Sequence, residues 1–399
     1  MLVAVAVSGG RDSMALLHCT ARAAKALGIQ VIALHVHHGL QKQADEWAAI
    51  IEKACKRWSV GIATRRLEAK PPKGDSVEAW ARRERYAALA AMAQEAGAGL
   101  VLLAHHQRDQ AETFLLQALR GAGPAGLAAM PSTAQRSGIV WARPWLSMRR
   151  ETIDAYARRH RLRFVDDPSN ADSRYARSRL RMDVMPALRL AFDDADASLS
   201  ASAARCAEAS DLLAEVAQAD LALVGDGAAL LLAPWHALSG ARQRNALRAW
   251  LHERLDRGAP ETLVERLMQE LPVSAPAQWP CEGIVLRRYR GRLEAIREPE
   301  VGGKLQSKPV AQGGVATALL RNAQWRARSG GEQFQRAVNT PPRSLKKQFQ
   351  GAAVPAWQRD APLLFSQDGR LLFVPGLGID ARVLAAPGEA QRSLTWVRR

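Results

Sequence analysis

The chain has 399 residues, and its length predicts two or three domains. Hydrophobic residues make up 48% and charged residues 24%, which excludes wholesale disorder, and no apolar run is long enough to predict a membrane span. Its 56 lysines and arginines against 39 acidic residues leave a net charge of +17. That imbalance favours a polyanionic partner, most often nucleic acid, although a proteome-wide basic bias would look the same.

The cysteines indicate the cellular compartment. The chain has four, Cys19, Cys55, Cys206 and Cys281, and no CxxC pair. A zinc ribbon or a cysteine-ligated cluster is therefore disfavoured, and scattered thiols suit a reducing cytosol better than a disulfide framework. Because the N-terminus also lacks a signal-like segment, we predict a cytoplasmic protein.

The first 120 residues alternate apolar runs with helical patterns. We expect strands at 2–7, 31–38, 60–67 and 99–106, and helices at 13–27, 45–58, 76–97 and 109–120. This alternation predicts an α/β fold, with a parallel sheet covered by helices on both faces. Ligands of such sheets bind beyond the carboxyl ends of the strands. The segments of interest are therefore 8–13, 35–40 and 105–112.

The rest of the chain indicates further domains. We predict a nucleotide-binding domain at 1–190, a helical connector at 191–220, and two smaller α+β or β-rich domains at 221–298 and 324–399, separated by a linker at 299–323. A short strand is expected at 221–224, and a hairpin around Asp368 and Gly369. The last domain carries 12 basic and five acidic residues.

The strongest motif is SGGRDS at 8–13, between a buried strand and a helix. Backbone amides at Gly9 and Gly10 and the helix N-terminus suit phosphate oxygens, and Ser8 and Ser13 add hydroxyl donors. Asp12 would repel phosphate unless a magnesium ion lies between them. The sequence is not a Walker A loop. A Ser/Asp-capped turn without ligand is the alternative.

This motif resembles the PP-loop of the N-type ATP pyrophosphatases, which cleave ATP between the α- and β-phosphates. Further segments resemble the tRNA(Ile)-lysidine synthetases: HVHHGL at 35–40, EAWARRERY at 78–86, AHHQRDQAETFLL at 104–116, RGAGPAGLAAM at 120–130, DDPSNADSRYARSRLR at 166–181, RSGGE at 328–332, RSLKKQFQ at 343–350 and VPGLG at 374–378. These segments occur in the family's order along nearly the whole chain. The resemblance weakens between about 220 and 325.

The resemblance implies an ATP-dependent ligase that forms a carbon–nitrogen bond. ATP adenylates the carbon-2 oxygen of the wobble cytidine in the CAU anticodon of isoleucine tRNA. The ε-amine of free L-lysine then displaces AMP and gives lysidine. ATP and Mg²⁺ are the implied cofactors. No glutaminase partner is expected, since there is no N-terminal cysteine nucleophile, and the oligomeric state stays open.

The resemblance also implies site residues. ATP contacts are expected at Ser8, Gly9, Gly10, Arg11, Asp12, Ser13 and His35, and catalytic roles at Asp12, His105, Asp109, Glu112 and Arg177, with Asp12 and Asp109 as magnesium ligands. Lysine or tRNA contacts are expected at Glu78, Arg82, Arg85, Arg174, Lys346 and Lys347.

Each of these roles has a purely structural alternative. Asp109 and Glu112 share a helix face, where they suit magnesium or an ammonium, but capping and solvation would explain them too. A surface ion-pair ladder would explain residues 78–85. His35 and His37 share one face of a strand and could bind a metal instead, but no nearby cysteine supports this alternative. Trp325, Trp357 and Trp396 are expected in the core rather than stacked on bases.

Three positions depart from the family pattern. Arg108 stands where members often carry an acid, Gln41 where a basic residue is usual, and Ser178 where asparagine is common. Arg108 and Ser178 keep the second of two alternatives open, and the absence of paired cysteines disfavours the first. One is another PP-loop tRNA-modifying enzyme, such as a thiolase, and the other is a tRNA-binding protein with a decayed nucleotide site.

Overall fold

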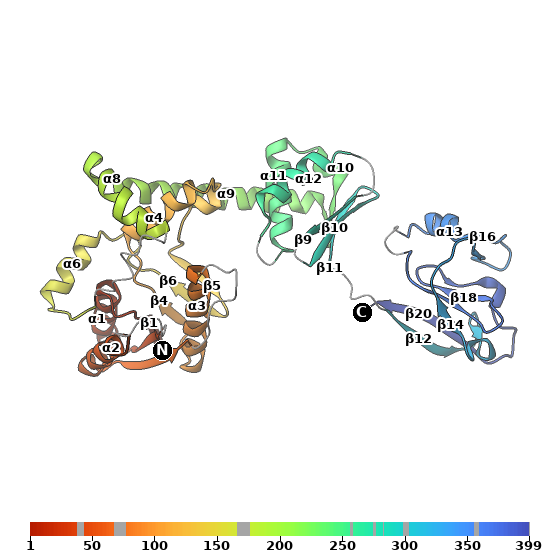
Figure 1. Ribbon diagram of the computed structural model, residues 1–399, viewed down its shortest axis with the longest axis horizontal. Coiled ribbons are helices and arrows are strands. Elements are labelled where there is room, and N and C mark those ends of the chain that lie inside the picture. Colours follow the sequence, from red (N-terminus) through yellow and green to blue (C-terminus); the bar gives the residue numbers. More distant parts are fainter. Residues whose placement is uncertain are drawn as a thin grey trace. The chain divides into compact units, whose positions relative to one another are not determined.

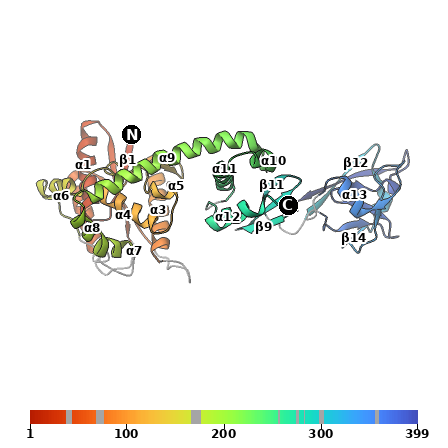
Figure 2. The same cartoon turned by 90° about the horizontal axis from the view of Figure 1, so that it is seen from above.

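The computed structural model describes residues 1–37, 44–67, 77–165, 176–255, 258–273, 277–281, 283–297, 303–354 and 359–398 (Figure 1, Figure 2). The chain forms two compact units, Met1–Glu215 and Val216–Arg399. No helix among these residues combines the length and apolar character needed to cross a membrane.

The first unit is built on a six-stranded sheet in the order β3-β2-β1-β4-β6-β5. Its strands are β1 (Leu2–Ala6), β2 (Gln30–His37), β3 (Gly61–Arg66), β4 (Leu100–Leu102), β5 (Thr133–Arg136) and β6 (Ile139–Ala142). All neighbours pair in parallel except β5, which runs antiparallel to β6. The strand order reverses between β1 and β4, which is where α/β sheets bind ligands.

Helices cover both faces of this sheet, as the sequence predicts. Alternate residues of a strand point to opposite faces, so Val5 and Val7 pack with α1 (Arg11–Ala26), α2 (Ala44–Trp58) and α6 (Arg150–Arg159). Ala4 faces the other way and joins the core beneath α3 (Val77–Glu95). In Figure 1, α1 and α2 lie on one side of the strands and α3 on the other.

The remaining helices of the first unit follow β4. They are α4 (Gln107–Ala118), α5 (Pro124–Leu127), α7 (Ala176–Arg179), a π-helix η2 (Leu180–Val184), α8 (Met185–Ala191) and the long α9 (Ala195–Val224), which runs past Glu215 into the second unit. Leu180 and Met185 pack with Ala111 of α4. This contact brings the arginine-rich segment 177–181 beside α4.

The second unit begins with an antiparallel sheet in the order β7-β8-β11-β10-β9. Three fully buried tryptophans, Trp235, Trp250 and Trp279, form the centre of its core. The elements are β7 (Gly225–Asp226), β8 (Ala229–Leu231), α10 (Leu232–His236), α11 (Gly240–His252), α12 (Glu261–Glu270), β9 (Ala277–Cys281), β10 (Ile284–Tyr289) and β11 (Arg292–Arg297).

The C-terminal part is β-rich and contains three small sheets, β12-β20-β13, β14-β17-β18-β19 and β15-β16. The expected hairpin is confirmed, because β17 and β18 pair antiparallel around Asp368 and Gly369. Its elements are β12 (Gly303–Val310), β13 (Val315–Ala316), η3 (Thr317–Leu320), β14 (Gln324–Arg326), β15 (Gln333–Phe334), β16 (Arg343–Ser344), α13 (Leu345–Gly351), β17 (Leu363–Phe365), β18 (Leu371–Val374), β19 (Gly378–Ile379), η5 (Ala381–Val383) and β20 (Gln391–Arg398).

Three sequence expectations are corrected by these elements. Residues 303–323 are not a linker, since β12 pairs along its whole length with β20 near the C-terminus. Residues 221–224 are not a strand but the last turn of α9. The strand expected at 99–106 is shorter, because the chain leaves the sheet after Leu102 and His106 begins α4 as its N-cap.

Candidate active site

The loop between β1 and α1 is closed by its own two serines. Ser13 Oγ donates to the Gly10 carbonyl at 2.9 Å and accepts from the Ser8 backbone N–H at 3.2 Å. Gly9 has a φ of +88°, in the left-handed region that favours glycine. No side chain of the described residues caps the first turn of α1. The N–H groups of that turn therefore remain suited to an anion, at the carboxyl end of β1.

Asp12 in this first turn faces the second strand end. Its Oδ2 lies 3.5 Å from Nε2 of His106, while Oδ1 is buried and has no hydrogen-bond partner among the described residues. Burial opposes ionisation of Asp12, but contact with His106 and the charge of Arg150 together bring its pKa below the ordinary value. Asp12 is thus a carboxylate with one oxygen atom left for a ligand.

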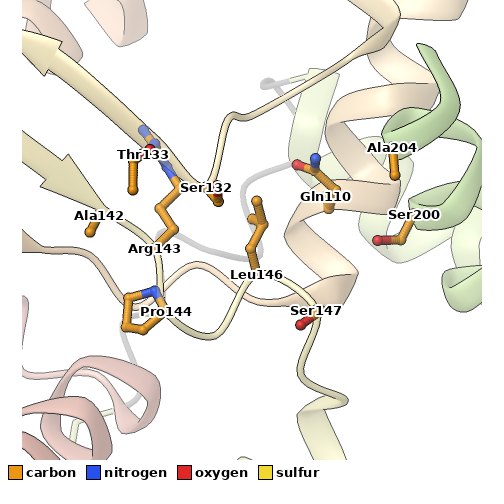
Figure 3. A pocket seen from close by; sticks show the side chains of 10 residues that line it. All are labelled: Gln110, Ser132, Thr133, Ala142, Arg143, Pro144, Leu146, Ser147, Ser200 and Ala204. Atoms are coloured by element: carbon orange, nitrogen blue, oxygen red, sulfur yellow. The ribbon is translucent and has the colours of Figure 1, made fainter. Parts of the chain in front are cut away.

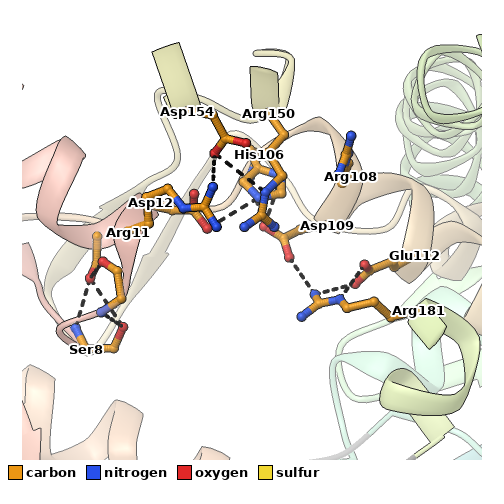
Figure 4. Close-up of polar contacts among 12 residues, drawn as sticks. Ser8, Arg11, Asp12, His106, Arg108, Asp109, Glu112, Arg150, Asp154 and Arg181 are labelled. Carbon is orange, nitrogen blue, oxygen red and sulfur yellow. Dashed lines mark hydrogen bonds and ion pairs between the residues drawn. The ribbon is translucent and has the colours of Figure 1, made fainter. Parts of the chain in front are cut away.

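His106 links Asp12 to Asp109 (Figure 4). Its side chain is 2% exposed, and its Nδ1 lies 3.5 Å from Asp109 Oδ2, which also accepts the His106 backbone N–H at 3.1 Å. Burial opposes the charge of Asp109, yet His106 and Arg177 lower its pKa. The two expected magnesium ligands therefore lie on either side of one buried imidazole.

His105 is the neighbour for which the sequence analysis expected catalysis. Burial lowers its pKa to about 3, with Arg143, Arg177 and Arg85 contributing and Asp109 opposing. The imidazole is therefore neutral near pH 7. Its Nδ1 is buried without a hydrogen-bond partner in the described part of the chain. A neutral ring of this kind suits hydrogen bonding to a substrate better than charge stabilisation.

Glu112 is held by two arginines. Its side chain is 2% exposed, and it accepts from Arg177 Nε at 3.0 Å and from Arg181 at 2.8 and 2.7 Å. Arg177 also reaches Asp109 Oδ1 at 3.1 Å. Both carboxylate oxygens of Glu112 are thus occupied by Arg177 and Arg181.

Two other expected ATP contacts lie beside the loop. Arg11 donates to Asp154 of α6 at 2.7 Å, which ties the first turn of α1 to that helix. His35 is buried, and its Nδ1 donates to the Val7 carbonyl at 2.9 Å. Burial lowers the pKa of His35, so its ring is neutral and supports the end of β1.

The residues that were expected to contact lysine or tRNA are spread over both units of the chain, unlike the residues of the strand ends. Arg82 and Arg85 of α3 both lie over the Tyr86 ring, at 5.4 and 5.7 Å from its centroid. Glu78 is in the first turn of α3, but its side chain lies outside the described residues, as do Arg174 and Gln41 entirely. Lys346 and Lys347 are exposed on α13 in the second unit.

A cavity of about 360 Å³ opens beside α4 (Figure 3). Its wall is formed by Gln110, Ser132, Thr133, Ala142, Arg143, Pro144, Leu146, Ser147, Ser200 and Ala204. Arg143 is the charged residue of this lining, so an ammonium would meet a like charge there. The cavity is therefore less suited to free lysine than the carboxylates of the strand ends.

Known proteins match this chain over nearly its whole length. Three family models match, the PP-loop domain at residues 1–188, the TilS substrate binding domain at 230–294 and the TilS substrate C-terminal domain at 323–396. The tRNA(Ile)-lysidine synthase of Ralstonia nicotianae is 41% identical, covering 96% of this chain and 90% of the relative. That of Burkholderia mallei is 36% identical, covering 95% and 89%.

The chain belongs to the tRNA(Ile)-lysidine synthase family. It is therefore an ATP-dependent ligase with a PP-loop domain, and the resemblance and the α/β fold class stated from the sequence are confirmed.

Arg108 stands where members of the family often carry an acid, and the structure shows what it contacts instead. Arg108 forms ion pairs with Glu151 of α6 and, through Nε at 3.3 Å, with Asp196 in the first turn of α9. Arg189 of α8 shares Asp196 at 2.9 Å. Arg108 thus joins three helices instead of supplying a second carboxylate to the site. Ser178 lies in α7, next to Arg177.

Two residues of this site, His106 and Arg181, were not predicted from the sequence. His106 was passed over for its neighbour His105, although the pair stood together at a strand end. Arg181 lies four residues after Arg177, and this spacing places two residues on one helix face. The spacing was therefore a usable signal for a two-arginine contact.

Proposed function

We propose that this chain joins free L-lysine to carbon 2 of the wobble cytidine in the CAU anticodon of isoleucine tRNA, in the cytoplasm. The carbon-2 oxygen of cytidine attacks the α-phosphorus of ATP, and pyrophosphate leaves. The ε-amine of lysine then attacks carbon 2, AMP departs with that oxygen, and the amine loses a proton. The observation that carries the proposal is the contact between Asp12 and His106, which joins the PP-loop to the α4 segment.

ATP binding is assigned to residues 8–13. The uncapped first turn of α1 directs N–H groups and the positive end of the helix dipole toward a phosphate. The Ser8 and Ser13 hydroxyls lie 3.2 Å apart at the same loop. The Ser8 hydroxyl can donate its O–H to the departing pyrophosphate, whereas the Ser13 O–H is donated to the Gly10 carbonyl.

Magnesium is assigned to Asp12 first and to Asp109 second. Asp12 Oδ1 is buried and has no hydrogen-bond partner in the described structure, which fits a hard cation. Asp109 already accepts from Arg177 and from the His106 backbone. A bound magnesium ion would neutralise phosphate charge, so that the carboxylate of Asp12 no longer repels ATP.

The lysine amine and the cytidine are assigned to the face formed by His105, Asp109 and Arg177. Asp109 is the carboxylate there that suits an ammonium, and neutral His105 has a free nitrogen for a substrate hydrogen bond. Glu112 acts as a positioning residue through its two arginines. We assign tRNA backbone contacts to Arg82, Arg85, Arg174, Lys346 and Lys347, and a lysine or tRNA contact to Glu78.

The thiolase alternative is disfavoured by the cysteines. All four are free, and Cys55 of α2 is buried in the core that this helix shares with α1 and the sheet. Burial raises the pKa of its thiol to about 11, so the reactive thiolate is scarce at neutral pH. The carboxylate, arginine and histidine groups of the site suit adenylation and amine transfer instead.

The deciding experiment is mass analysis of tRNA nucleosides. The purified chain is incubated with ATP, Mg²⁺, L-lysine and an isoleucine tRNA transcript bearing CAU, and one cytidine is expected to gain the mass of one lysine molecule minus one water molecule. A transcript with uridine at the wobble position, and a reaction without lysine, serve as controls. Unchanged cytidine in the complete reaction would overturn the proposal.

A further inference from the structure

Two tryptophans of the C-terminal part form a ring pair at its surface. The centroids of Trp325 and Trp396 lie 4.9 Å apart, with ring planes at 60°. Trp396 of β20 packs against the buried core that includes Leu364 and Leu394. Trp325 of β14 remains 38% exposed. The sequence expectation of a core position is therefore wrong for Trp325, which lies over the core rather than within it.

The segment that carries Trp325 is exposed and basic. β14 is the edge strand of its sheet, and every residue from 324 to 330 is exposed. Between residues 321 and 331 there are three arginines, Arg321, Arg326 and Arg328, and no acidic residue. Soluble proteins usually place charged residues on such edges, so an exposed tryptophan there needs an explanation.

We propose that Trp325, supported from behind by Trp396, stacks on an unpaired nucleobase of the tRNA. This inference takes the tRNA from the proposed function and adds one contact between that tRNA and the chain. Bases in an RNA duplex are covered by their neighbours, whereas unpaired bases offer a free face to an aromatic ring. Arg326 of the same strand and its chain neighbours Arg321 and Arg328 provide the charge that a nearby phosphate requires.

The test measures tRNA affinity of the full-length chain over a range of salt concentrations. Trp325→Ala and Trp325→Leu are expected to weaken binding by roughly 5-fold or more, and Trp325→Phe to retain most of it, because only an aromatic ring can stack. The salt slope should be unchanged, since tryptophan displaces no counterions. Val338→Ala, at a position 67% exposed, is the matched control and should bind like the parent chain.

Further measurements separate stacking from a structural role. A fully base-paired RNA should bind equally to the parent chain and to Trp325→Leu, and thermal unfolding should show that the variant is folded. Wild-type tRNA affinity in folded Trp325→Leu, or equal losses on tRNA and duplex, would overturn the proposal. Loss of self-association with unchanged tRNA affinity would instead assign the tryptophan to a protein interface and also overturn it.

The outcome is independent of catalysis. In the lysidine assay the weaker binding of Trp325→Leu should appear as a higher KM for tRNA than in the parent chain, because Trp325 lies outside the PP-loop domain. If the parent chain formed no lysidine but the variant still bound tRNA more weakly, the reaction proposal would fail and the stacking contact would stand.

Discussion

Nε2 of His106 lies 3.5 Å from Oδ2 of Asp12, across the point where the strand order of the sheet reverses. Asp12 follows β1 in the chain, and His106 follows β4. The imidazole therefore couples the first turn of α1 to the N-cap of α4. It sets the distance between the two carboxylates on which the proposed ATP chemistry depends.

We expect His106→Ala to lower AMP release by about 10- to 100-fold, the usual effect of removing a group that orients ligating residues. The substitution leaves the Asp12 and Asp109 carboxylates without their common neighbour. tRNA affinity, measured without ATP, should hardly change. His106→Asn, which keeps one N–H donor, should recover part of the activity. Normal AMP release in the alanine variant would remove His106 from the site.

Asp12→Ala and Asp109→Ala are expected to abolish adenylation while tRNA affinity stays nearly intact. Asp109→Ala should also destabilise the protein by about 1 kcal/mol, because the side chain caps α4. Asp109→Asn keeps an acceptor for that cap, so it should be folded like the parent yet inactive. Pyrophosphate release and thermal unfolding measure the two effects, and turnover near normal in any of the three would contradict the assignment.

Glu112→Gln is expected to destabilise the fold by about 3 kcal/mol, since Arg177 and Arg181 lose the buried carboxylate that they share and keep only Asp109 as a charged partner. Glu151→Gln is the matched control. Glu151 also pairs with an arginine but is 66% exposed, so its loss should cost at most about 1 kcal/mol. Urea unfolding compares the two, and equal effects would show that the Glu112 contacts contribute little.

Stability should fall as the pH falls below about 6.5, the ordinary pKa of histidine. His105 has a pKa of about 3 in the folded protein, so in this range the unfolded chain takes up a proton that the folded chain does not. His18 and His35 have lowered pKa values and act in the same direction. Asp12 and Asp109 also have lowered pKa values, but their stabilisation is lost only in stronger acid.

His105→Gln tests this pH dependence. Urea unfolding at about pH 7 and about pH 5 should show a smaller loss of stability in the variant than in the parent chain. His18→Gln supplies a second histidine for comparison. Equal losses in the parent and in His105→Gln would show that His105 does not titrate as its burial implies.

Lys346→Ala with Lys347→Ala is expected to weaken tRNA binding and to reduce its salt slope by about 1 to 2, because each phosphate contact releases counterions. Both side chains are exposed on α13, so folding should be unaffected. Lys25→Ala, at an exposed position in the last turn of α1, is the control. A slope equal to that of the parent would show that the two lysines face only solvent.

Much of the first unit followed from local pattern. Apolar runs predicted β1 and β2, and the rule for strand ends directed attention to residues 8–13 and 105–112. The structure places those two segments together through Asp12 and His106. Predictions of strands and helices succeed because the spacing of apolar residues along the chain reflects which face of the element is buried.

The C-terminal part was less predictable. Residues 303–310 are polar and rich in glycine and proline around their ends, so they looked like a linker, yet they pair with residues 391–398. Trp325 looked like a core residue because tryptophan is large and apolar. Its exposure depends on Trp396, which occupies the position nearer the core.

The amino-acid sequence by itself determined the α/β class, the phosphate loop and the family, since all three are written in contiguous residues. Tertiary structure alone decided which of two adjacent histidines lies between the carboxylates. It also decided that Glu112 is neutralised by arginines 65 and 69 positions further along the chain. The partners of a charged or aromatic side chain are chosen by packing between distant segments, and no local pattern records that choice.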